Sequence, residues 1–250
     1  MPTFETPGSV SLQIKLPSGR VVVTTADEPR TTVEVVALGR RGQDAVDEIA
    51  ITMDERSGRH VVRVEQRDRF RWGPIQITWG GDYECRVTCP PGTDLELSGP
   101  ATDVRVDGEL GEVTARTASG DIRLQDVAGP LQVKTASGDV SVNAVRGNAT
   151  IGTVSGDVSV ERLAAPLAAR AVSGDITIGT VAAELGISTT SGDVQVKAVL
   201  AGDVRIQTVS GDVRIGIARG TRVWVDATSV SGKLDSELGL DDQAVEVQAE

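Results

Sequence analysis

Thr117-Ala118-Ser119-Gly120-Asp121 decides the fold, because this pentapeptide returns at a fixed interval along the chain. The Asp residues of its six clear copies are separated by 18, 18, 18, 18 and 19 residues. A constant period of this length is typical of a coiled chain in which each repeat stacks on the previous one. The later copies begin at Thr135, Thr153, Ala171, Thr189 and Thr208, and a worn copy spans Ser229 to Lys233.

Each period contains two nonapeptides in which apolar and polar residues alternate. Ser119 to Val127 is followed by Ala128 to Ala136, with apolar residues at positions 4 and 6 and polar or small residues at positions 5 and 7. Alternation at period two predicts a strand with one buried face. Hairpins would not require the same residues at every second corner, whereas a coil stacks residue i on residue i+18. We therefore predict an all-β protein, a right-handed parallel β-solenoid with two strands per 18-residue coil.

The composition indicates a thin hydrophobic core and a surface that does not favour binding of nucleic acid. Of the 250 residues, 39% are apolar but only 2% are aromatic, and 28 are glycine. The net charge of -11 is concentrated in residues 93–250, which hold 13 Lys and Arg against 23 Asp and Glu. Because an acidic repeat repels nucleic acid and anionic lipid, we expect no nucleic-acid partner.

The N-terminal region, residues 1–92, is β-rich but lacks the regular period. Ala50 to Asp54 and His60 to Gln66 are expected to form a hairpin. Leu16-Pro-Ser-Gly-Arg-Val-Val resembles a degenerate copy of the later corner, so an earlier start of the solenoid stays open. We expect a β-rich cap in residues 1–92 and the β-solenoid repeat in residues 93–250.

Four of the six aromatic residues gather with arginines between positions 67 and 83. One interpretation is a contact surface for a sugar, a peptide or a protein partner, in which Arg stacks on Trp. The other is a cap that covers the open end of the core. The candidate partner-contact residues are Arg69, Arg71, Trp72, Trp79 and Tyr83.

The repeated Asp residues would lie one above another in a coil. Unit charges ~4.8 Å apart repel by roughly 0.9 kcal/mol even in water, so another interaction must offset the repulsion. The local interpretation is that each Asp, at its Gly corner, accepts hydrogen bonds from nearby backbone N–H groups, as in an Asx turn. The alternative is a row of cations such as calcium, although the spacing differs from that of calcium-binding nonapeptides. The candidate ion-binding residues are Asp121, Asp139, Asp157, Asp175, Asp193 and Asp212.

The remaining reactive side chains predict neither a metal centre nor a disulfide. Cys85 and Cys89 would lie roughly 13 Å apart on one face of an extended strand, beyond disulfide reach, so we predict two free thiols. With His60 they fall short of the about four ligands of a zinc site, and we expect no metal and no cofactor. The repeated Thr continues the inward set of positions, and its hydroxyl is expected to face the interior.

The sequence predicts no enzyme. The outward positions lack paired carboxylates, and His60 has no nucleophile that could complete a triad. The first residues show no basic segment that leads into an apolar run, and no stretch approaches the ~18 apolar residues of a membrane span. We therefore expect a cytoplasmic protein, with a cell-surface or secreted location as the alternative.

The Thr-x-Ser-Gly-Asp-Val pattern and the closing segment from Gly220 to Lys233 resemble a bacterial family of β-strand-repeat proteins named putative adhesins, a domain of unknown function. The likeness extends over roughly residues 8–240. It implies a β-solenoid and supplies no catalytic residues. We therefore predict a non-catalytic interaction or scaffold protein whose protein or surface-polymer partner is unknown. The alternatives are a calcium-stabilised cell-surface adhesin and a β-solenoid that assembles into filaments.

Overall fold

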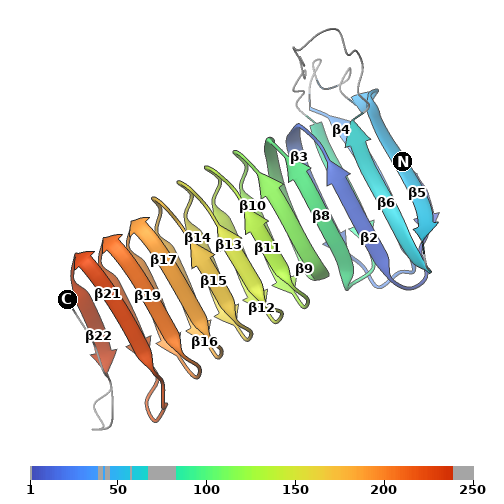
Figure 1. Ribbon diagram of the computed structural model, residues 1–250. Helices are drawn as coiled ribbons and strands as arrows, with labels where there is room; N and C mark the ends of the chain where they lie inside the picture. The colour runs from blue at the N-terminus through green and yellow to red at the C-terminus, as the bar shows by residue number, and fades with distance from the viewer. Residues whose placement is uncertain (1, 39–41, 43–45, 57, 67–82, 239–250) are drawn as a thin grey trace. The chain divides into compact units, whose positions relative to one another are not determined.

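The structure is a computed structural model that describes residues 2–38, 42, 46–56, 58–66 and 83–238. The chain divides into two compact units, residues 1–128 and residues 129–250, and each consists of stacked β-strands (Figure 1). The division expected between residues 92 and 93 falls inside the first unit, because the strands on either side of it belong to the same sheets.

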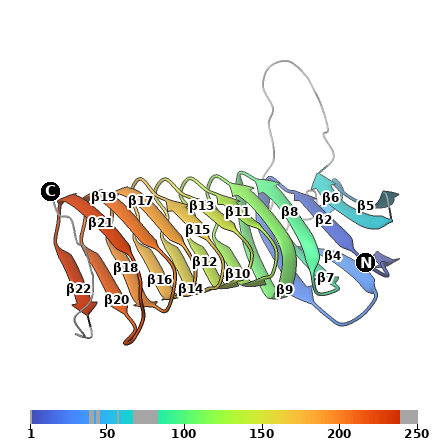
Figure 2. The same cartoon turned by 60° about the horizontal axis from the view of Figure 1, so that its bottom comes forward.

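Unit 2, residues 129–250, consists of coils with two strands each. One sheet contains β11 (Leu131–Lys134), β13 (Ala149–Gly152), β15 (Leu167–Arg170), β17 (Leu185–Ser191), β19 (Val204–Ser210) and β21 (Val225–Ser231). The other contains β12 (Val140–Val145), β14 (Val158–Leu163), β16 (Ile176–Val181), β18 (Val194–Val199), β20 (Val213–Ile217) and β22 (Leu234–Leu238). The two rows of strands form two layers (Figure 2).

The pairings within both sheets of unit 2 are parallel and join each coil to the next. Val140 lies opposite Val158, which lies opposite Ile176. The predicted parallel β-solenoid with an 18-residue coil is therefore confirmed. The coils lengthen toward the end of the chain, since Val213 is paired with Leu234.

The core of unit 2 lies between the two layers and is built from small aliphatic side chains. Positions 4 and 6 of the nonapeptides are buried as predicted, and Val140 and Val142 are each 1% exposed. A third buried position, which the alternation did not predict, closes four strands of the second sheet, β12, β14, β16 and β18: Val145, Leu163, Val181 and Val199. Each fully buried aliphatic side chain contributes about 1.5–3 kcal/mol to the free energy of folding. Each additional coil adds further side chains of this kind to the core.

Unit 1, residues 1–128, combines parallel and antiparallel strands. One sheet runs through β5 (Ile49–Arg56), β6 (Arg59–Gln66), β2 (Val10–Lys15), β8 (Thr93–Gly99) and the C-terminal part of β9 (Ala101–Thr117). The other runs through β1 (Thr3–Glu5), β4 (Arg30–Ala37), β7 (Tyr83–Cys89), β3 (Ser18–Thr25), the N-terminal part of β9 and β10 (Ile122–Val127). The long strand β9 thus belongs to both sheets.

The N-terminal region already contains solenoid strands. Gly19 pairs with Thr102 and Arg20 with Asp103, so the degenerate corner found in the sequence stacks on a later coil. The predicted hairpin is formed by β5 and β6, which are antiparallel. Antiparallel strands also occur in the other sheet, where β4 pairs with β1 and β7. Among the described residues, no helix has the length and apolar character needed to cross a membrane.

The glycines of the repeated corner are required by the distance between coils. A Cβ atom on Gly156 would lie 2.0 Å from the carbonyl oxygen of Gly138. On Gly192 it would lie 2.2 Å from the carbonyl oxygen of Gly174, and the φ of Gly192 is +142°. Both obstacles are backbone atoms, which cannot rotate away. The corner therefore excludes every side chain for reasons of space.

Replacing a corner glycine should destabilise the protein far more than replacing a strand glycine. For Gly156→Ala we expect the free energy of unfolding to fall by about 2–3 kcal/mol, as for overpacked sites. The control is Gly152→Ala, because the nearest atom to its new Cβ would be 4.0 Å away, and we expect a change of less than about 1 kcal/mol. Urea denaturation measures both, and equal losses would contradict the steric explanation.

Candidate functional site

The repeated Asp residues of unit 2 form a ladder in which each carboxylate binds the backbone of the next coil. Oδ1 of Asp139 accepts the N–H of Asp157 at 3.0 Å, and Oδ1 of Asp157 accepts the N–H of Asp175 at 2.8 Å. The same bonds, 2.8 and 2.9 Å long, continue through Asp193 to Asp212. The ladder ends on the N–H of Lys233, 3.0 Å from Oδ1 of Asp212. The donors of these bonds are nearby backbone N–H groups, and they lie one coil further along the chain.

The same interaction occurs in unit 1. Oδ1 of Asp103 accepts the N–H of Asp121 at 3.1 Å, and Oδ2 of Asp121 lies 2.9 Å from Nη2 of Arg123. Asp103 lies outside the pentapeptide repeat, so the sequence did not single it out. Its signal was the 18-residue spacing to Asp121.

These bonds offset part of the repulsion within the column, because each carboxylate faces a backbone N–H dipole. One oxygen of each bridging carboxylate is engaged in this way. Calcium needs 6–8 oxygen ligands, so an ion at the column would require ligands beyond these carboxylates. Within the described ranges, no group of three or more His, Cys, Asp and Glu is arranged to hold a metal ion.

The ladder predicts that an amide can replace the carboxylate but a methyl group cannot. Asn retains the Oδ1 acceptor and removes one charge from the column, so we expect Asp175→Asn to change the free energy of unfolding by less than about 0.5 kcal/mol. Asp175→Ala removes the acceptor and should cost about 1–2 kcal/mol. Denaturant titration of both variants is the test. If Asn were as damaging as Ala, the bond to Asp193 would not be the stabilising contact.

The repeated Thr residues face the interior, as predicted, and tie the corner from within. Thr135 and Thr153 are 7% and 6% exposed. The hydroxyl of Thr135 accepts the N–H of Gly138 at 3.0 Å, and that of Thr153 accepts the N–H of Gly156 at 2.9 Å. Thr and Asp thus bind the corner from its two sides.

The aromatic and arginine patch of the sequence analysis is largely outside the described residues, which include none of Arg69, Arg71, Trp72 and Trp79. Tyr83 is described and corrects the expectation, because it is 1% exposed and lies in the core of unit 1. A Cβ on Gly19 would lie 3.1 Å from its ring. Tyr83 opens the inward set of β7, so its side chain is not available for a partner. Burial raises the pKa of its hydroxyl to about 12.

The two cysteines follow Tyr83 on the inner side of β7, and both are free thiols, as predicted. Cys85 and Cys89 are each 0% exposed. Burial raises the pKa of Cys85 to about 12 and that of Cys89 to about 11.

The buried thiols should be unreactive while the protein is folded. Only the thiolate attacks a disulfide reagent, so at pH 8 we expect both to react with Ellman's reagent about 100-fold or more slowly than in urea. The single variant Cys89→Ser assigns the residual rate to one residue. Fast reaction of the native protein would show that β7 opens.

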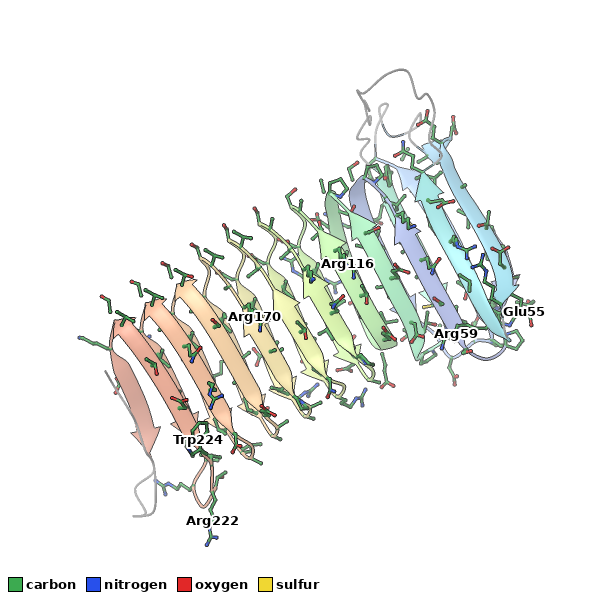
Figure 3. All side chains as sticks on the ribbon, in the orientation of Figure 1. Glu55, Arg59, Arg116, Arg170, Arg222 and Trp224 are labelled. Carbon is green, nitrogen blue, oxygen red and sulfur yellow. The ribbon has the colours of Figure 1, made fainter. Side chains whose placement is uncertain are left out.

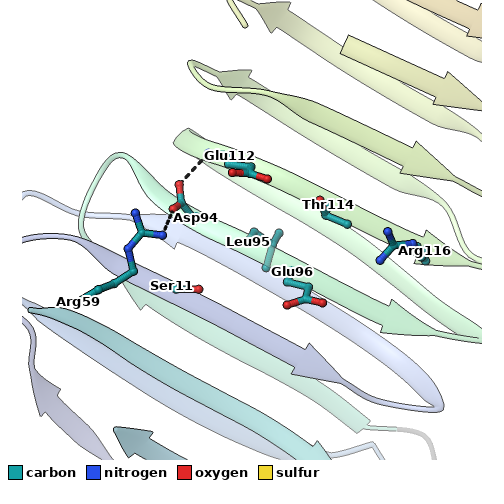
Figure 4. A pocket seen from close by; sticks show the side chains of 8 residues that line it. All are labelled: Ser11, Arg59, Asp94, Leu95, Glu96, Glu112, Thr114 and Arg116. Atoms are coloured by element: carbon teal, nitrogen blue, oxygen red, sulfur yellow. Dashed lines mark hydrogen bonds and ion pairs between the residues drawn. The ribbon is translucent and has the colours of Figure 1, made fainter. Parts of the chain in front are cut away.

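An open hollow of about 270 Å³ lies on unit 1, and Figure 4 shows its lining. Asp94 is bound from two sides: Oδ2 lies 2.7 Å from Nη1 of Arg59, and Oδ1 accepts the N–H of Glu112 at 2.8 Å. The hollow is polar, since its lining consists mainly of charged and hydroxyl side chains. The lining residues are Ser11, Arg59, Asp94, Leu95, Glu96, Glu112, Thr114 and Arg116.

A row of linked polar side chains crosses four strands of this sheet and ends at the hollow. Nε of Arg63 donates to Oε1 of Gln13 at 2.9 Å, and Nε2 of Gln13 donates to Oε2 of Glu96 at 3.2 Å. Arg63 also pairs with Asp54. The row joins β5, β6, β2 and β8. The sequence analysis did not find it, because its members are brought together by the register of strands that lie far apart along the chain.

Unit 2 carries an exposed arginine–tryptophan pair near its last coils. Trp224, labelled in Figure 3, is 44% exposed. The guanidinium of Arg205 lies 5.3 Å from the centroid of its ring, and Nε of Arg205 lies 3.2 Å from Oδ2 of Asp226. This arrangement is a cation–π contact between a guanidinium and an indole ring, and the sequence analysis did not single out its residues.

The stacked coils and their bridging Asp, Thr and Gly residues define a parallel β-solenoid repeat protein. The family model Toastrack DUF4097 matches residues 10–249, and the chain belongs to this family. The resemblance noted in the sequence is thereby confirmed. A crystal structure of a putative adhesin from Parabacteroides distasonis ATCC 8503 is similar to this chain, with a TM-score of 0.46 and 14% identity over 100% of this chain and 94% of that one. No curated protein matches the chain.

Proposed function

We propose that the protein is a non-catalytic interaction protein whose polar sheet faces bind a partner polypeptide. The observation that carries the proposal is the row Asp54–Arg63–Gln13–Glu96 and the hollow at its end. Alternating charges across neighbouring strands present a fixed pattern of donors and acceptors. Such a pattern recognises a polar, charged segment of another protein.

The row is suited to binding because its side chains are already held in place. Immobilising a long side chain on binding costs about 0.5–1.5 kcal/mol, and Arg63, Gln13 and Glu96 have lost much of that freedom before a partner arrives. Exposed ion pairs contribute little to stability, typically 0–1 kcal/mol. The links therefore act mainly by positioning the side chains.

Two further side chains of unit 1 are held in place by backbone or charged groups. Nε2 of His60 lies 3.2 Å from the carbonyl oxygen of Pro7, which is the geometry of an N–H donating to that carbonyl. In the hollow, the Asp94 carboxylate is likewise bound to Arg59 and to the backbone of Glu112. These contacts hold both side chains in fixed positions at the edge of the sheet, as a preformed binding surface requires.

The proposal is tested by capture and by charge reversal. A photo-crosslinking residue at Thr114 should capture a discrete partner from an extract of the native source, and the purified partner should bind with a measurable Kd. Glu96→Lys should weaken that binding about tenfold, because it reverses the charge at the hollow. Glu184→Lys is the control, since it makes the same change on an exposed residue of unit 2.

Two results would contradict the proposal. Equal weakening by Glu96→Lys and Glu184→Lys would show that only the total charge matters. Chemical conversion of the captured partner by the purified protein would show that the role is not restricted to binding. Thermal melting of both variants verifies that the fold is intact.

A further inference from the structure

A line of exposed valines runs along one corner of unit 2. The residue before the corner Ser is Val154, Val172, Val209 or Val230 in four coils, and these side chains are 48%, 47%, 51% and 73% exposed. Seven large apolar side chains of the described residues are exposed, and four of them lie in this one column. Apolar residues scattered singly on a surface are ordinary, whereas an aligned set indicates an interaction surface.

The valines are held in line by the backbone. The N–H of Ser173 donates to the carbonyl oxygen of Val154 at 2.7 Å, and the N–H of Ser191 donates to that of Val172 at 2.8 Å. Further along, Thr208 pairs with Ser229 and Ser210 with Ser231, which sets Val209 beside Val230. Thr190 occupies the column between Val172 and Val209. The column, which we call the valine edge, is therefore as rigid as the coils.

The Asp ladder runs beside the valine edge. Each Asp follows its Val by three residues, as Asp157 follows Val154, which places the two lines at most about 10 Å apart. Asp157, Asp175 and Asp193 are exposed although Oδ1 binds the backbone. The corner thus presents an apolar line and an acidic line side by side.

We propose that the valine edge of unit 2 binds a basic amphipathic α-helix of a partner protein. This inference rests on the proposed role of the chain as an interaction protein and names a surface and a partner class for it. The apolar stripe of the helix would cover the valines, and Lys or Arg on its flank would face the Asp ladder. A helix is about 10–12 Å across, which suits two lines at this separation.

The repeat of the column favours a helix over an extended strand. The positions of the column recur every ~4.8 Å, the distance between parallel strands, and valine occupies four of these five positions. A helix presents one apolar side chain per turn of ~5.4 Å, so it drifts by about 2–3 Å over the four steps of the column. A strand presents side chains of one face every ~6.8 Å, and it loses register after about two steps.

Charge disfavours a second copy of this chain as the occupant. Two valine edges packed face to face in antiparallel orientation would bring two Asp ladders together, and like charges across an interface oppose association. A cationic segment is attracted by the same ladder. The Asp ladder therefore favours a positively charged partner, and the valines favour a partner with an apolar stripe.

The test uses a designed probe, a 14-residue peptide of leucine and lysine patterned as an amphipathic helix. A peptide of the same composition with leucine and lysine alternating is the strand control. Fluorescence anisotropy at 0.15 M salt should show binding of the helical peptide to the wild-type protein and at least tenfold weaker binding of the alternating one. The double variant Val172→Ser/Val209→Ser should weaken the helical peptide at least tenfold.

Matched variants separate the apolar line from charge. Leu200→Ser removes a leucine that is 47% exposed elsewhere on unit 2 and should leave binding unchanged. Asp175→Asn/Asp193→Asn retains the Oδ1 acceptors and should weaken binding severalfold while reducing its dependence on salt. All variants concern exposed side chains, and thermal melting verifies their folding.

Several outcomes would overturn the inference. The first is that the helical peptide does not bind the wild-type protein. The second is that it binds the Val172→Ser/Val209→Ser variant as tightly as the wild type. The third is that only the Asp175→Asn/Asp193→Asn variant weakens its binding. Concentration-dependent dimerisation that the valine variant abolishes would assign the edge to a second copy. If the partner captured at Thr114 is lost with Glu96→Lys but binds the valine variant normally, the proposed function stands and this inference fails.

Discussion

The structure depends on the ~4.8 Å distance between hydrogen-bonded parallel strands. Every residue that recurs at the corner must fit within one such step. Gly156 meets the requirement by having no side chain, since the carbonyl of Gly138 occupies the place of a Cβ. Asp157 spans the step with a carboxylate that reaches the N–H of Asp175. Thr153 fills the inner side of the corner and accepts the N–H of Gly156. One distance thus accounts for three members of the repeated pentapeptide.

The repeat allowed the solenoid to be predicted from sequence because its period and its alternation are both one-dimensional properties. Whether an 18-residue spacing stacks coils, and which residues face inward, can be counted along the chain. The partner of Asp139 could not be counted in this way, because the sequence alone does not show which backbone N–H lies within reach of its carboxylate. Tyr83 was misplaced for a related reason. The sequence analysis grouped it with the preceding arginines and aromatics, but its environment is set by its place on β7.

The candidate surfaces were less accessible to sequence reasoning than the fold. The row from Asp54 to Glu96 joins strands whose register depends on the N-terminal pairings, and no repeat marks those positions. The valine edge is marked by the repeat, yet valine before a corner also fits the ordinary preference of β-branched residues for strands. Exposure distinguishes the two explanations: Val158 is 1% exposed, whereas Val230 is 73% exposed. The sequence alone therefore cannot separate buried valines from those of the valine edge, and their exposure in the structure is needed to do so.

The Asp ladder has a direction, because each of these carboxylates accepts the N–H of the coil that follows it. Removing a complete coil would therefore again leave a donor facing an acceptor at the new junction. The ladder also tolerates extra residues between corners, since the same bond joins Asp193 to Asp212 across 19 residues and Asp212 to Lys233 across 21 residues. Duplication of one coil would extend the valine edge by one step and leave every corner as it was.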